Sequence, residues 1–363
     1  MKITISQEQL SHGLQSVQNV VSTRSTLPIL SNVLLRAEND ALTLIATDLD
    51  ITVSVTVEAK VEQPGATTLP AKRLFEIVRE LGSAEISIEV DDKQQCILQA
   101  GSSYFKMSGL AAEEFPPLPT FNENRQVRLK QEVLKDLFKK TSYATSPDAS
   151  RFVLHGILMS LKDHAVTMVA TDGRRLALAE AEVDIPPTSQ GDCIIPNKMI
   201  DELNRLLGTG DVDILISPNQ VAFKMPNVFL ISKLIEGIYP NYKQVIPQET
   251  KERITLLREE FLTALRRASI MTSEKSNSVK VHLGRNTLSI TANTPDVGEV
   301  RESMAINYQG KEFAIAFNPE FMMQPLKALT NDEVYLELID ELSPGLLKTQ
   351  GAFLYVLMPM RMS

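Results

Sequence analysis

Hydrophobic positions along the chain follow two different periods. Apolar residues spaced three or four apart predict helices, whereas strict alternation predicts half-buried strands. The clearest alternation lies at residues 51–57, where Ile and Val alternate with Thr and Ser. Helical spacing occurs in six segments: 6–20, 71–81, 130–141, 197–207, 257–268 and 318–329. The mixture predicts an α+β fold.

Prolines mark the starts of three of these expected helices. Pro70, Pro196 and Pro319 precede or open them, at positions where a missing N–H costs no helical hydrogen bond. Pro325 lies inside the last expected helix and is expected to kink or shorten it.

One phrase recurs along the chain. Leu42–Asp48 returns as Val166–Asp172 and, more weakly, as Leu288–Asn293, at intervals of about 120 residues. Each copy follows a polar pair that is typical of a β-hairpin turn. These observations predict three copies of one domain, each with two helices packed on antiparallel sheets. The expected domains span residues 1–120, 126–246 and 252–363.

Composition limits the class of protein. The chain has 363 residues, 43% of them hydrophobic and 23% charged, which is typical of a globular protein. It opens without the apolar core of a secretion signal, and we therefore expect a cytoplasmic protein with no membrane partner. The two cysteines, Cys96 and Cys193, lie far apart in strand-like segments and are expected to be reduced thiols.

The charge distribution is uneven. The net charge of −8 argues against coating nucleic acid by bulk attraction. The expected helices are on balance slightly basic, however, and the acidic excess lies elsewhere. A surface lined by these helices would tolerate a polyanion. Ordinary solvated helix faces rich in Lys and Arg explain the same pattern equally well.

Catalytic chemistry has little support in the sequence. The four histidines are not paired at metal-ligand spacing, and no glycine-rich phosphate loop or nucleophile motif occurs, so we expect no cofactor and no metal. Only Thr171–Arg175 places a carboxylate beside two guanidinium groups. Because the first repeat carries Thr47–Asp50 at the same position, we interpret Asp172 as a turn residue. An enzyme that uses Asp172 with Arg174 or Arg175 remains an alternative, as does a monomeric scaffold.

The C-terminal segment stays apolar almost to its end. Residues 352–357 are typical of a last strand, but Met358, Pro359, Met360 and Met362 extend beyond it. Methionines at an exposed edge are typical of adaptable binding surfaces. A tail that folds back onto its own domain is the alternative.

Together with the repeats, three segments carry a resemblance: Arg24–Leu30, Ala170–Leu176 and Met358–Arg361. They resemble the bacterial sliding-clamp family, the β subunits of DNA polymerase III, over the whole length of the chain. The resemblance implies three similar domains per subunit and a head-to-tail homodimer that closes a ring with helices lining the hole. It also implies a non-catalytic processivity factor that encircles double-stranded DNA. Short linear motifs of the replicative DNA polymerase, the clamp loader and repair factors would bind to a groove between the second and third domains.

Site residues follow from this resemblance. Those implied to face DNA are Arg24, Lys72, Arg151 and Lys198, to which helix placement adds Lys139, Arg205 and Arg266. The implied partner-peptide groove has as its walls Leu154, Thr171, Gly173, Arg174, Arg175, Leu176, Pro240, Val245, Val356, Met358, Pro359, Met360 and Arg361. At the implied dimer interface, Phe105 and Met107 meet Ile270 and Met271. Arg174 stands where some relatives carry His.

Overall fold

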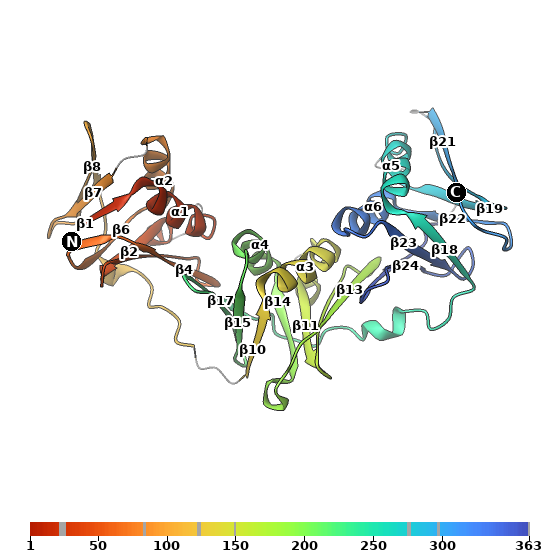
Figure 1. Cartoon of the computed structure of the whole chain (residues 1–363), viewed down its shortest axis with the longest axis horizontal. Helices are drawn as coiled ribbons and strands as arrows, with labels where there is room; N and C mark the ends of the chain where they lie inside the picture. The colour runs from red at the N-terminus through yellow and green to blue at the C-terminus, as the bar shows by residue number, and fades with distance from the viewer. Residues whose placement is uncertain are drawn as a thin grey trace. The chain divides into compact units, whose positions relative to one another are not determined.

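Two compact units make up the chain in the computed structural model. Unit 1 comprises Met1–Glu132 with Asp201–Leu234, and unit 2 comprises Val133–Ile200 with Ile235–Ser363. Each unit contains an eight-stranded antiparallel sheet and a smaller antiparallel sheet (Figure 1). The structure describes residues 1–21, 27–82, 85–121, 125–148, 150–273, 277–295 and 298–361.

The six predicted helices are all present. Their bounds are α1 (Gln7–Val17), α2 (Ala71–Glu80), α3 (Gln131–Thr141), α4 (Asn197–Leu206), α5 (Arg258–Ser269) and α6 (Pro319–Ala328). Helix α1 begins after Ser6, whose hydroxyl accepts a hydrogen bond from the Gln9 N–H and so satisfies one of the free donors of the first turn. Its apolar positions Leu10, Leu14 and Val17 are buried, as their spacing predicts.

The sheets of unit 1 join strands from different repeats. The large sheet has the order β10-β15-β16-β17-β4-β3-β2-β6, and the small one β5-β1-β7-β8-β9. The bounds of the large sheet's strands are β10 (Arg125–Lys130), β15 (Asp211–Ile216), β16 (Gln220–Lys224), β17 (Val228–Lys233), β4 (Ile51–Glu58), β3 (Ala41–Thr47), β2 (Asn32–Glu38) and β6 (Gly65–Pro70). Those of the small sheet are β5 (Lys60–Gln63), β1 (Lys2–Ser6), β7 (Glu85–Val90), β8 (Gln95–Ala100) and β9 (Ser103–Ser108).

Unit 2 repeats this arrangement. Its large sheet has the order β14-β11-β12-β13-β25-β24-β23-β18, and its small sheet β21-β20-β19-β22. The bounds of the large sheet's strands are β14 (Gly191–Pro196), β11 (Gly156–Lys162), β12 (Ala165–Thr171), β13 (Arg175–Glu182), β25 (Phe353–Leu357), β24 (Gly345–Lys348), β23 (Glu333–Leu338) and β18 (Glu252–Leu257). Those of the small sheet are β21 (Gly298–Ala305), β20 (Thr287–Thr294), β19 (Val279–Gly284) and β22 (Phe313–Phe317).

The repeated hairpins have the predicted turns. Asn39 and Asp40 between β2 and β3 both have positive φ angles, and so do Asp163 and His164 between β11 and β12. Two successive residues with positive φ are the requirement of the type I′ turn, whose twist matches that of a two-strand hairpin. The first two repeats therefore share this turn in detail.

Helix α1 approaches β3 closely in unit 1. A Cβ atom on Gly13 would lie 2.7 Å from the Leu44 side chain, so α1 tolerates only glycine at this position without a shift. Leu44 and Val57 point toward α1, and alternation along β4 therefore directs Thr52, Ser54 and Thr56 to the opposite face. Helix α1 also contacts α2, and in unit 2 α5 and α6 lie side by side in the same way (Figure 1).

Helix α6 continues through Pro325, contrary to the expectation that this proline shortens it. Asn318 caps the helix, because its side-chain oxygen accepts hydrogen bonds from the Glu320 and Phe321 N–H groups. Pro325 has no N–H to donate to the carbonyl of Phe321, four residues earlier. The hydroxyl of Tyr355 in β25 donates to that carbonyl instead, at 2.8 Å. The lost hydrogen bond is therefore replaced by one from a strand.

Both cysteines are free thiols in buried positions, as their strand-like surroundings predict. Burial raises the pKa of Cys96 to about 11, which keeps this thiol protonated at neutral pH. None of the helices in the described residues is both long and apolar enough to cross a membrane.

Candidate functional site

The turn between β12 and β13 is built by hydrogen bonds from Thr171 and Asp172. The Asp172 Oδ1 atom accepts from the backbone N–H of Arg174 (2.9 Å) and of Arg175 (3.1 Å). The Thr171 hydroxyl donates to the Arg175 carbonyl at 2.6 Å and accepts from the Gly173 N–H at 3.1 Å. Gly173 has a φ of 85°, which favours glycine. Asp172 is a structural turn residue, as predicted.

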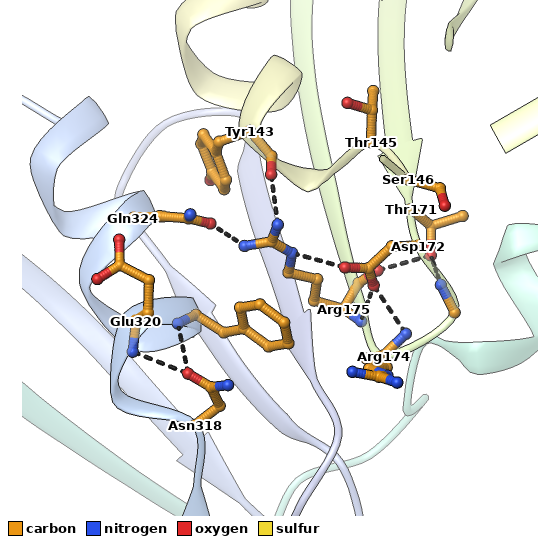
Figure 2. Close-up of polar contacts among 12 residues, drawn as sticks. Tyr143, Thr145, Ser146, Thr171, Asp172, Arg174, Arg175, Asn318, Glu320 and Gln324 are labelled. Atoms are coloured by element: carbon orange, nitrogen blue, oxygen red, sulfur yellow. Dashed lines mark hydrogen bonds and ion pairs between the residues drawn. The ribbon is translucent and has the colours of Figure 1, made fainter. Parts of the chain in front are cut away.

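The Arg175 side chain is buried, and its guanidinium lies between Asp172 of this turn and Gln324 (Figure 2). Its Nε atom donates to Asp172 Oδ2 at 3.1 Å, and its Nη2 atom donates to the carbonyl of Tyr143 at 2.6 Å. Its Nη1 atom donates to the side-chain oxygen of Gln324, and the guanidinium carbon lies 4.1 Å from the centre of the Phe321 ring. Only 7% of the side chain is exposed, so Arg175 binds α6 and not solvent.

On one face of β13 the apolar side chains form a continuous cluster. We call this the β13–β25 face, defined by its buried members Leu158, Val169, Leu176, Ile194, Tyr239, Leu346 and Val356. Strand pairing explains its continuity, since Leu176 lies opposite Val356 and Val356 lies opposite Leu346 in the sheet. Leu154 packs against the cluster as well. The structure thus brings together Leu154, Leu176 and Val356, three of the residues expected in a partner groove.

The C-terminal tail after β25 runs beside the Thr171–Arg175 turn. The Met358 N–H donates to the Arg174 carbonyl at 3.0 Å, and the Met360 N–H donates to the Ala316 carbonyl of β22 at 2.7 Å. The tail therefore folds back onto its own unit, yet Met358 and Met360 keep 42% and 38% of their surface exposed. The structure shows the tail that folds back, and a binding role for its exposed methionines stays a prediction.

Exposed groups border the same region. Val245 is 48% exposed, and Gly173, Arg174, Pro240 and Arg361 are exposed as well. Arg174 points away from Arg175, and its guanidinium lies on the other side of the turn (Figure 2). The Arg151 Nη1 atom donates to the Asp172 carbonyl at 3.2 Å. Arg151 and Arg174 therefore flank the turn that borders the β13–β25 face.

Most of the residues expected to face DNA are exposed in the structure. Lys72, Lys139, Lys198 and Arg266 are exposed on α2, α3, α4 and α5. Arg151 is 58% exposed, next to Asp148. Arg24 lies outside the described residues.

The Arg205 guanidinium forms hydrogen bonds that its position on α4 did not predict. Its Nη1 and Nη2 atoms donate to the carbonyls of Gln15 and Ser16, at 2.7 and 2.8 Å, and Nη2 also contacts the Glu202 carboxylate. These carbonyls belong to the last turn of α1, where cations are favoured by the helix dipole. In the structure Arg205 is a cap for α1, and its guanidinium is not free for a phosphate.

The residues expected at a dimer interface lie on or near the ends of the small sheets. Strand β9, which carries Phe105 and Met107, is an edge strand in unit 1. Phe105 is partly exposed, whereas Met107 is 8% exposed and packs within its own subunit. In unit 2, Ile270 follows α5 with 71% of its surface exposed, and Met271 is partly exposed. Met107 therefore has little surface left for a partner.

Comparison with known proteins decides the family. The models of the N-terminal, central and C-terminal domains of the DNA polymerase III beta subunit match residues 1–119, 128–241 and 243–361. The chain belongs to the bacterial sliding-clamp family.

Individual relatives agree with this assignment over the whole or nearly the whole length of this chain. The beta sliding clamp of Chlamydia trachomatis is 37% identical over 100% of this chain and 87% of that protein, and that of Bacillus subtilis is 33% identical over 99% of this chain and 100% of that protein. The crystal structure of a Pseudomonas aeruginosa sliding clamp bound to griselimycin superposes with a TM-score of 0.96 at 32% identity, and a Bacillus subtilis clamp with 0.95 at 32%. Each comparison covers 100% of both chains.

Membership in the sliding-clamp family settles one of the alternatives, the enzyme. Clamps are non-catalytic processivity subunits, so the interpretation of Asp172 as a catalytic group is wrong. In the structure this carboxylate is 10% exposed and both of its oxygens accept hydrogen bonds from the turn. Within the described residues no cluster of three or more His, Cys, Asp or Glu side chains is placed to hold a metal ion.

The sequence interpretation missed most of the buried residues of the β13–β25 face. Tyr239, Leu158, Val169, Ile194 and Leu346 are buried in the β13–β25 face but were not among the expected groove residues. Strand alternation contained part of the signal, because Val169 lies two positions before Thr171 and so shares its face. The partners on β14 and β24 could be found only from the strand pairing.

Proposed function

We propose that two copies of this chain form a head-to-tail ring in the cytoplasm that encircles double-stranded DNA. The ring tethers the replicative polymerase, the clamp loader and other replication or repair factors through short peptide segments that bind the β13–β25 face. The domain bounds in this proposal are 1–120, 126–246 and 252–363. The protein is a processivity factor, and its hold on DNA is topological.

One observation carries the peptide site. The β13–β25 face is a continuous apolar cluster, and the methionines of the tail beside it remain partly exposed. The members of the face are themselves buried, so the apolar anchors of a peptide would contact the exposed residues at its border, such as Met358, Met360 and Val245. These anchors gain free energy when they leave water there, and polar rim groups then fix their orientation. Methionine adapts its shape to different anchors, which suits a site that accepts several partners.

The charge distribution supports a DNA contact that is weak. Exposed Lys and Arg side chains on the helices offer phosphate contacts, while the net charge of the whole chain is −8. Tight phosphate binding would stop sliding, and a closed ring needs no such affinity to stay on DNA. The proposed DNA-facing residues are Lys72, Lys139, Arg151, Lys198 and Arg266, with Arg24 added from the family resemblance alone.

Two variants test the peptide site and the ring independently. Deletion of residues 359–363 removes the Met360 contact with β22, and we expect the affinity for the replicative polymerase of the same bacterium to fall more than about tenfold while the dimer persists. Phe105→Asp places a charge on edge strand β9, and we expect a monomer that still binds the polymerase.

Surface plasmon resonance and light scattering, both applied to each variant, provide the measurements. Polymerase binding equal to wild type after the deletion would show that the peptide site is wrong. An unchanged dimer mass for F105D would show that β9 does not form the interface.

A further inference from the structure

Arg205 connects two repeats of the chain. It lies on α4 in the second repeat, and it donates hydrogen bonds to the Gln15 and Ser16 carbonyls of α1 in the first repeat, at 2.7 and 2.8 Å. Its Nη2 atom also contacts the Glu202 carboxylate, whose side chain is 8% exposed. Because the donor is a guanidinium, these hydrogen bonds are stronger than those between neutral groups. Arg205 is therefore a specific link between α4 and the end of α1.

Helix α1 depends on this link for the charge at its end. Its last turn contains no basic residue, and the Gln15 and Ser16 carbonyls belong to that turn. The carbonyls at the end of a helix carry a partial negative charge, which a nearby cation stabilises. The last turns of α2 to α6 each contain such a cation of their own: Arg79, Lys139, Lys140, Arg205, Arg266, Arg267 and Lys327. Arg205 thus stabilises α1 only when the two repeats are correctly placed.

Lys327 is the equivalent of Arg205 in the third repeat. Each is the last residue but one of its helix, α6 or α4. Lys327, however, pairs with Glu320 of its own helix at 3.3 Å, and 45% of its side chain is exposed. The two residues share a position in the repeat and a positive charge, but their partners differ. The link to another repeat is therefore a property of Arg205 and does not follow from the repeated fold.

The first two repeats are also joined in the large sheet of unit 1. Strand β4 pairs with β17, and the Lys233 ammonium contacts the Asp50 carboxylate at 2.9 Å. The angle between neighbouring strands ranges from about 10° to 35° among proteins, so one pair of strands leaves some freedom to rotate. The hydrogen bonds of Arg205 lie away from this strand pair, at the end of a helix that packs on β3 and β4. A second contact at that place opposes the rotation.

We propose that Arg205 is a positioning residue that fixes the angle between the first and second repeats and thereby keeps the ring closed. Head-to-tail copies form a ring only when their rotations close the circle. A subunit that already has the required angle loses less conformational entropy when its two ends meet those of its partner. Arg205 acts here without a contact to DNA. This inference rests on the proposed ring and names a residue that regulates its opening.

The experiment measures how long the loaded protein stays on DNA. The clamp loader of the same bacterium places wild-type or variant protein on nicked circular duplex DNA, gel filtration removes the loader, and the bound fraction is followed with time. We expect the half-life of Arg205→Met on the circle to be about tenfold shorter, because opening no longer breaks hydrogen bonds from a charged donor. We also expect faster hydrogen exchange of the amides in the last turn of α1 in the free protein.

Three further variants separate the link from a simple loss of charge. Lys327→Met removes the same charge at the equivalent position and is the matched control, so its half-life and α1 exchange should equal wild type. Arg205→Lys keeps the charge, but its ammonium lacks the planar fork that reaches several acceptors, so it should show part of the loss. Glu202→Gln weakens the hold on Arg205 and should show a smaller loss with faster α1 exchange. E202Q also keeps the test decisive if R205M does not fold.

Three results would overturn the inference, and they differ in what they leave standing. If R205M and E202Q keep wild-type half-lives and wild-type α1 exchange, Arg205 does not position the repeats and the ring stands. If R205K equals wild type while R205M and K327M lose half-life equally, Arg205 acts only as a positive charge toward DNA. If wild-type protein leaves the circle as fast as it leaves the same DNA after linearisation, the proposed ring is wrong, and this inference falls with it.

Discussion

Strand β4 in unit 1 and strand β13 in unit 2 occupy equivalent places in two similar sheets. Each follows a Thr-Asp turn, and each pairs with the last strand of the next repeat, β17 or β25. On the face away from α1, however, β4 presents Thr52, Ser54 and Thr56, whereas the matching positions of β13 are Leu176, Leu178 and Glu180. The same backbone therefore carries two different surfaces.

The consequence is visible in the apolar clusters. In unit 1 that face has two separate clusters, one containing Leu34 and Ile45 on β2 and β3, and one containing Ala222 and Ile231 on β16 and β17. Strand β4 lies between them and interrupts the apolar surface with hydroxyl groups. In unit 2 the cluster continues across the corresponding strands. Two positions on one strand thus separate a continuous apolar face from an interrupted one.

Transfer of the polar residues of β4 into β13 should have the largest effect, both on stability and on polymerase binding. The double change Leu176→Thr with Leu178→Ser divides the β13–β25 face, and the loss of buried apolar volume should cost about 2–4 kcal/mol of unfolding free energy. Polymerase binding should be lost. Urea denaturation and surface plasmon resonance measure the two effects, and wild-type binding by a folded double variant would contradict the comparison.

The reverse change in unit 1 should have a smaller effect. Thr52→Leu joins the two clusters, but it removes the 2.9 Å hydrogen bond between the Thr47 and Thr52 hydroxyls. The apolar gain and the polar loss should leave the unfolding free energy within about 1 kcal/mol of wild type. Polymerase binding should not change, because this surface has no equivalent of the tail. A second polymerase bound per subunit would show that an apolar face alone is enough.

We expect the smallest effects on stability at the third residue of each of the two Thr-Asp turns. Gly173 and Leu49 both have positive φ angles, of 85° and 78°. Gly173→Ala has space, since the nearest atom is Arg151 Nη1 at 3.5 Å, so its cost of about 1 kcal/mol is conformational. Leu49→Gly should relieve strain and stabilise the protein by less than about 1 kcal/mol. Thermal unfolding should therefore shift in opposite directions for the two variants, and a shift in the same direction would contradict the equivalence of the turns.

Sequence patterns predicted the local structure well, because periodicity, capping and turn residues act over a few positions. The helix segments, the 39–40 and 163–164 hairpins and the structural role of Asp172 follow from such signals. The positions of Arg175 and Arg205 depend on pairing between distant segments. Arg175 meets α6 only because β13 pairs with β25, and Arg205 meets the last turn of α1 after a long intervening chain. No local pattern contains this information.

Sheets that cross from one repeat to the next have a consequence for how such a protein evolves. The sequence repeats three times, yet β17 pairs with β4 and β25 pairs with β13. Each large sheet is therefore completed by strands from two successive repeats. A single ancestral copy cut out at a repeat boundary would expose an unpaired edge strand, which invites aggregation. A single repeat would therefore need a second copy, in the same chain or in another one, to cover this edge.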